Sequence, residues 1–187
     1  MDKLAADILD FWFATDDGPR DAWFRKDPAF DNTIRLRYGA AVDAAIGGAY
    51  EEWMRSPREA LACVLLCDQF TRNIYRDTPK AFAGDVRALA IAERMVDTQQ
   101  DIALKPYERS FLYLPFEHSE DPAAQERGIA LYTRLADETG LAGSLEWAQK
   151  HAAIIRRFSR FPHRNAILGR PSTPEETVFL AGPGSRF

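Results

Sequence analysis

The chain has 187 residues, of which 46% are hydrophobic and 12% aromatic, and it carries a formal net charge of −4. A chain of this length can bury a sizeable core in one domain, and this composition excludes a disordered protein. The acidic balance argues against a general nucleic-acid or membrane-surface binder, because both need a strong basic excess.

The N-terminus and the cysteines both indicate a cytoplasmic protein. Residues 1–13 carry acids among their apolar residues, so they lack the regions of a signal peptide, and no apolar run is long enough to cross a membrane. Cys63 and Cys67 are four residues apart in one apolar stretch. That spacing predicts two thiols on one buried helical face, where a disulfide is geometrically poor.

Apolar residues recur at helical spacing in most of the chain, beginning with Leu4, Ile8 and Phe11, and strand-like alternation is nearly absent. Proline follows Asp, Ser or Thr at five positions, where the first residue can cap a helix and the proline suits its first turn. We therefore predict helices over residues 3–14, 28–46, 48–55, 57–69, 79–98, 106–114, 122–139, 144–159 and 174–181.

Short connections between these helices predict one all-α domain, a stack of antiparallel helices. No repeat of fixed period is visible, and no linker marks a domain boundary. Residues 182–187 are predicted to form a flexible tail.

Three polar segments follow apolar helices. They read DQFTRNIYR at 68–76, EHSED at 117–121 and SRFPHRNAILGR at 159–170. The first and third each place a Phe before an Arg-Asn pair, with another Arg a few residues later. Of the 24 basic residues, 19 are Arg, and residues 151–170 hold five Arg and two His with no acid. Arginine favours bidentate pairing with carboxylate or phosphate.

The sequence also resembles the domain of unknown function 924 family of mostly bacterial proteins. The segments that carry the resemblance are ILDFWF at 8–13, WFRKDPAFD at 23–31, DQFTRNIYRDTPKAF at 68–82, ERSFLYLPFEHSED at 108–121, QERG at 125–128 and RFPHRNAILGRPSTPEE at 160–176. One departure is Thr71, where the family usually has proline. The resemblance implies a tetratricopeptide-like, all-α fold and no established activity.

The polar segments allow three interpretations. The first is a binding module for a small anionic ligand or a peptide carboxylate. Its ligand-binding residues are Arg72, Asn73, Arg76, His163, Arg164 and Asn165, with Arg160 as a further candidate. The arginines would hold phosphate or carboxylate groups, and the amides and imidazole would donate directional hydrogen bonds.

The second interpretation is an enzyme that acts on a phosphorylated or carboxylated small molecule. Glu117 and His118 would be its catalytic acid/base pair, because His titrates near neutral pH and burial tunes Glu. The third is a scaffold in which these polar groups pair with one another and tie helix ends together. In that interpretation Asp121 is a helix cap.

Metal and cofactor sites are less well supported. His118 and Glu120, with His163 as a third ligand, offer a weak metal pattern that lacks the helical spacing of zinc enzymes, so we expect no metal and no cofactor. Most tryptophans should be core, whereas Trp23 and Phe24 precede two basic residues and could line a pocket or an interface. His151 is predicted to be a hydrogen-bonded core residue. Oligomeric state stays open.

Overall fold

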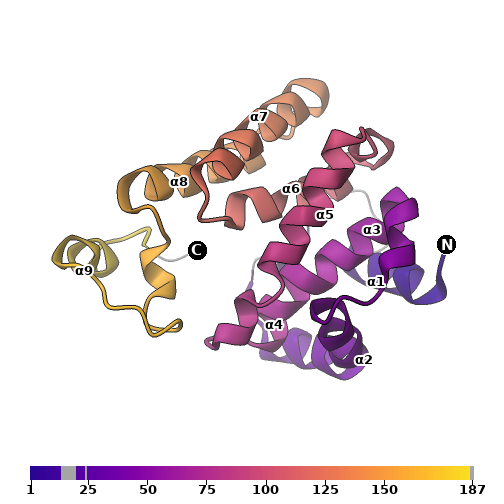
Figure 1. Ribbon diagram of the computed structural model, residues 1–187, viewed down its shortest axis with the longest axis horizontal. Helices are drawn as coiled ribbons and strands as arrows, with labels where there is room; N and C mark the ends of the chain where they lie inside the picture. Colours follow the sequence, from indigo (N-terminus) through magenta and orange to yellow (C-terminus); the bar gives the residue numbers. More distant parts are fainter. Residues whose placement is uncertain (14–19, 24, 186–187) are drawn as a thin grey trace.

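The computed structural model describes residues 1–13, 20–23 and 25–185, and these ranges contain helices and no strand (Figure 1). The helices are α1 (Lys3–Phe13), α2 (Pro28–Ile46), α3 (Pro57–Val64), α4 (Thr71–Ile74), α5 (Asp85–Asp97), α6 (Pro106–His118), α7 (Pro122–Thr139), α8 (Ala142–Phe158) and α9 (Pro174–Ala181). The all-α prediction is confirmed, and the tetratricopeptide-like arrangement stays a prediction.

Shorter segments connect these helices. The 3₁₀ segments are η1 (Asp21–Trp23), η2 (Glu51–Arg55), η4 (Pro79–Phe82), η5 (Asp101–Ala103) and η6 (Pro162–Arg164), and η3 (Leu65–Phe70) is a π-helical segment that joins α3 to α4. The cap predictions hold at Asp27, Asp121 and Thr173, whose side chains accept backbone N–H groups of the following helix. Ser56 and Thr78 make no such bond.

One hydrophobic core extends from α1 into the first half of α8. Helices α5 and α6 lie between the α1–α4 side of the molecule and the α7–α8 pair (Figure 1). A second, small hydrophobic cluster lies at the end of α8 and includes residues from the chain that follows it, residues 159–185, which we call the C-terminal segment. The cluster consists of Ile154, Ile155 and Phe161, with Phe158 and Phe179 packed against them. The C-terminal segment is therefore anchored apart from the main core, and it reaches the main body mostly through polar contacts.

The predicted helix over 79–98 is wrong, because the chain breaks at Gly84 into η4 and α5. A Cβ atom at Gly84 would lie 2.2 Å from the carbonyl oxygen of Cys67, so the residue permits a close approach of α5 to η3. The predicted end of a helix at residue 114 is also wrong, because α6 continues past Pro115 to His118.

Most tryptophans and both cysteines are buried as predicted, and Trp23, which could have lined a pocket or an interface, belongs to the core. Trp12, Trp23 and Trp53 are buried, and Cys63 and Cys67 are buried free thiols. Trp147 is 51% exposed on α8, outside both hydrophobic clusters. Phe24 lies outside the described residues. In the predicted tail, Ser185 is buried and donates its hydroxyl to the carbonyls of Leu180 and Gly182.

Candidate functional site

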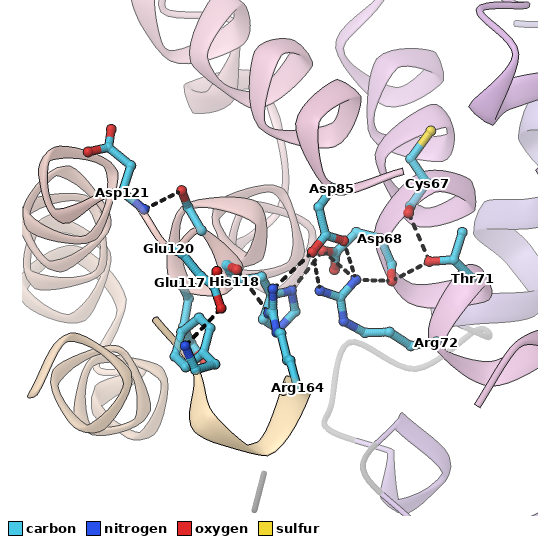
Figure 2. Close-up of polar contacts among 12 residues, drawn as sticks. Cys67, Asp68, Thr71, Arg72, Asp85, Glu117, His118, Glu120, Asp121 and Arg164 are labelled. Atoms are coloured by element: carbon cyan, nitrogen blue, oxygen red, sulfur yellow. Dashed lines mark hydrogen bonds and ion pairs between the residues drawn. The ribbon is translucent and has the colours of Figure 1, made fainter. Parts of the chain in front are cut away.

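A set of charged side chains meets where η3, α4, α5, α6 and η6 come together (Figure 2). We call it the central cluster, and it consists of Asp68, Arg72, Asp85, His118 and Arg164. These residues are far apart in the sequence. The π-helical segment places Asp68 at its core, and such segments occur often at functional sites.

Arg72 and Arg164 share the carboxylate of Asp85. Arg72 pairs with it in a bidentate manner, with Nη1 2.9 Å from Oδ1 and Nη2 3.1 Å from Oδ2. Arg164 approaches from the other side, with Nη1 3.4 Å from Oδ2 (Figure 2). Arg72 also lies 3.1 Å from the buried Asp68 carboxylate. Arg72 is therefore strongly neutralised, and Arg164 is neutralised much less.

The environment of Arg164 is unusual for a cation. The residue is 7% exposed, and its guanidinium carbon lies 4.7 Å from the ring centroid of Phe82 and 4.6 Å from that of Phe161. Its Nη2 donates to the backbone carbonyl of His118 at 2.9 Å, whereas its buried Nε has no hydrogen-bond partner among the described residues. Burial, with repulsion from Arg72, lowers the pKa of Arg164 to about 10.

Asp68 orients His118. The carboxylate Oδ1 lies 2.7 Å from Nδ1 of the imidazole, and Asp68 itself is fully buried. Despite its burial, the neighbouring Arg72 and His118 keep the pKa of Asp68 well below its usual range, so it is ionised. Burial and the charge of Arg72 lower the pKa of His118, against the opposing effect of Asp68. The imidazole is thus neutral near pH 7, with its proton on Nδ1 toward the carboxylate.

Glu117 lies beside the cluster but faces a different partner. Its Oε1 is 3.1 Å from Nδ1 of His151, which also donates to the carbonyl of Trp147 at 2.9 Å. Burial, with the negative charge of Asp68, raises the pKa of Glu117 to about 8. Burial lowers the pKa of His151 to about 3. Both side chains are therefore predominantly neutral at pH 7, and His151 is the hydrogen-bonded core residue that the sequence predicts.

The remaining ligand-binding candidates lie in two other places. Asn73 and Arg76 both bind the carboxylate of Asp31 on α2, with Asn73 Nδ2 2.7 Å from Oδ1. Asn165 donates to Ser172 and Glu176 in the C-terminal segment. The structure thus does not bring these three residues to the central cluster.

His163 is partly buried next to Arg164. Burial and the charge of Arg164 lower its pKa to about 4, and its ring centroid lies 5.6 Å from that of Phe161. Glu120, named with His118 as a weak metal pair, instead accepts two hydrogen bonds from Arg170 and one from the backbone N–H of Phe161. Across residues 1–13, 20–23 and 25–185, no three His, Cys, Asp or Glu side chains are grouped to hold a metal ion.

Sequence reasoning missed Asp85 and Phe82 as members of the site, and it placed Asp68 in the polar segment at 68–76 without naming it as a ligand-binding or catalytic candidate. Asp85 was hidden because the predicted helix over 79–98 placed it inside a helix, whereas it occupies the first turn of α5. The sequence signal that could have indicated a helix start at Asp85 was the glycine directly before it, Gly84. No sequence signal indicated Phe82, because only the fold brings its ring to Arg164. Arg160, the further candidate, is paired with Glu176 in the C-terminal segment.

Comparisons with known proteins identify relatives without an assigned activity. The profile of a family described as "Bacterial protein of unknown function (DUF924)" matches residues 8–184. A solved structure of a protein of unknown function, ATU0120 from Agrobacterium tumefaciens, is 44% identical, with a TM-score of 0.86 over 95% of this chain and 96% of that one. No curated protein matches the sequence. In the described part of the chain, no helix is long and apolar enough to span a membrane.

Proposed function

We propose that this chain, which belongs to the DUF924 family, binds a small anionic ligand, or a peptide carboxylate, through Arg164 of the central cluster, with the paired Arg72 beside it. The observation that carries the proposal is the state of Arg164. Its Nε is buried without an acceptor among the described residues, and its Nη1 lies 3.4 Å from a carboxylate oxygen, Oδ2 of Asp85.

A buried guanidinium group with an unpaired N–H lowers the stability of the fold unless another acceptor binds that N–H. An unsatisfied buried donor costs about 1–3 kcal/mol, and more when the group is charged. A carboxylate or phosphate oxygen would satisfy Nε, and a planar guanidinium is suited to both. The Phe82 and Phe161 rings hold the guanidinium plane in place without using any of its N–H groups.

Asp85 supports the proposal as well. It is a single carboxylate approached by two arginines, which resembles how proteins bind an anionic group of a ligand. Its side chain is 18% exposed, so the contact with Arg164 lies near solvent rather than deep in the core. An incoming anion would compete with Asp85 for Arg164 and leave the bidentate Arg72 pair in place.

A structural clasp is the second candidate, and a specific observation favours it. Each arginine of the polar segments already has an internal partner: Arg72 has Asp85, Arg76 has Asp31 and Arg164 has the carbonyl of His118. In this case the central cluster ties the C-terminal segment to α5 and α6, and it binds no ligand.

The test measures the free energy of unfolding in the presence of each of several small anions. This panel consists of inorganic phosphate, pyrophosphate, acetate, succinate and a short peptide with a free carboxylate. An anion at about a hundred times its Kd should stabilise the wild type by about 2.7 kcal/mol.

Arg164→Lys keeps the charge but removes Nε and the planar group, so it should abolish the stabilisation. Arg156→Lys is the matched control, because Arg156 pairs with Glu126 at the surface. If no anion stabilises the wild type and Arg164→Lys only lowers its stability, the clasp is correct.

A further inference from the structure

His118 combines an orienting hydrogen bond at one ring nitrogen with a second nitrogen that has no protein partner. The described residues give the ring one hydrogen bond, through Nδ1 to Asp68. Nε2 has no hydrogen-bond partner among the described residues, and it is not completely buried. The side chain is 15% exposed, whereas its partner Asp68 is 1% exposed. The ring is therefore held through Nδ1 by the buried Asp68, and Nε2 is left without a protein partner.

This arrangement matches what a general base requires. A carboxylate bound to Nδ1–H selects the tautomer whose Nε2 carries a lone pair, and it stabilises the imidazolium that forms on proton uptake. Arg164 lies close by, because its Nη2 donates to the backbone carbonyl of His118 at 2.9 Å.

We propose that His118, oriented by Asp68, is a general base that removes a proton from an O–H group of the anion held at Arg164. In this step the O–H bond breaks and its electron pair stays on oxygen. The N–H bond forms at Nε2, and the imidazolium charge is balanced by Asp68. The developing negative charge on oxygen is stabilised by Arg164. The substrate class is a small anion that also carries a hydroxyl group.

The choice of substrate rests on the proposed anion site, whereas the basic character of His118 does not. Glu117 has no part in the step. Its buried carboxyl group contacts His151 of α8 instead. The step proposed here therefore pairs His118 with Asp68 and not with Glu117.

Several charged or titratable groups surround His118. They are Asp68 and Arg72 from η3 and α4, Asp85 from α5, Glu117 on its own helix, His151 from α8, and His163 and Arg164 from η6. The two aspartates and the two arginines of this set balance one another in charge, whereas Glu117, His151 and His163 are predominantly neutral. Burial, and then the charge of Arg72, lower the pKa of His118, so the neutral imidazole is available as a base near pH 7.

The experiment uses the full chain, which has three histidines. Each is followed separately by mass spectrometry during modification with diethyl pyrocarbonate, which attacks an accessible, unprotonated imidazole nitrogen. His118 should react first, and Asp68→Asn should slow its modification several-fold. Nitrogen-15 NMR of the wild type should show the proton of His118 on Nδ1, which keeps the test valid if Asp68→Asn does not fold.

Inorganic phosphate is the probe for the link to Arg164. Phosphate should protect His118 in the wild type, and Arg164→Lys should lose the protection while His118 stays reactive. A reactive His118 without protection by phosphate or the other anions of the panel contradicts the anion site and leaves the base intact. An unreactive His118, or one protonated on Nε2 in the wild type, overturns the general-base assignment whatever phosphate does.

Discussion

The buried Glu117 carboxyl gives the protein a measurable dependence of stability on pH. Its pKa rises from 4.5 to about 8 on folding. Between these two values the folded protein binds more protons than the unfolded chain, so the free energy of unfolding falls as pH rises. Glu117→Gln keeps the shape and the acceptor but removes the titration, and the loss of stability through this window should disappear.

The size of the Glu117 effect is best measured above pH 6.5. All three histidines act in the opposite direction, because their pKa values are lowered on folding, to about 3 for His151 and about 4 for His163, and this opposing effect is strongest below pH 6.5. From pH 6.5 to pH 8, a shift of this size changes the stability by at most about 1.4 kcal/mol per pH unit. Since Glu117 is half ionised in the folded protein at pH 8, its own contribution to the loss of stability over this range is about 1.5–2 kcal/mol.

Urea unfolding at constant ionic strength, followed by tryptophan fluorescence and circular dichroism, measures the difference between variant and wild type at each pH. Glu117→Gln should gain about 1.5–2 kcal/mol relative to wild type between pH 6.5 and pH 8. Glu126→Gln, at an exposed surface pair, is the control and should give a constant difference. Parallel profiles for Glu117→Gln and wild type would show that Glu117 is ionised in the folded protein and refute the reasoning.

Three further changes test the fold by urea unfolding. Gly84→Ala places a Cβ atom against the Cys67 carbonyl and should cost about 1–3 kcal/mol, whereas Gly143→Ala, with open space around it on α8, should be neutral or slightly stabilising. Tyr113→Phe removes a hydroxyl that donates to the buried Asp101 and accepts from two arginines, so it should cost about 1–3 kcal/mol. Asp121→Ala removes the N-cap of α7 and should cost about 1 kcal/mol.

Local sequence signals predicted most helices, because the apolar stripe of a helix and the polar residue that caps it both lie in the same short stretch of sequence. Asp27, Asp121 and Thr173 cap the helices whose starts they mark. The failures occur where tertiary packing overrides the local pattern. Pro115 ought to end a helix, yet α6 continues past it with the ring buried in the core.

The site was predicted less completely than the fold. Sequence spacing indicated Arg72, His118 and Arg164, which the structure brings into one cluster. It also suggested Asn73, Arg76 and Asn165, which lie elsewhere. Asn73 and Arg76 bind Asp31 on α2, and Asn165 binds Glu176 on α9. Partners such as Asp31 and Asp85 come from distant helices, and no pattern in one sequence states which acid a given arginine will meet.

The central claim is that Arg164 Nε donates to an anion, and NMR of the arginine Nε–H groups tests it most directly. The Arg164 signal is assigned by its loss in Arg164→Lys, and the wild type is then titrated with inorganic phosphate and the other anions of the panel. The account predicts a saturable shift of this signal with at least one anion, and small changes for the Nε–H of Arg76, which is bound to Asp31. An Arg164 signal that no anion moves would contradict the anion site and leave the central cluster as a structural clasp.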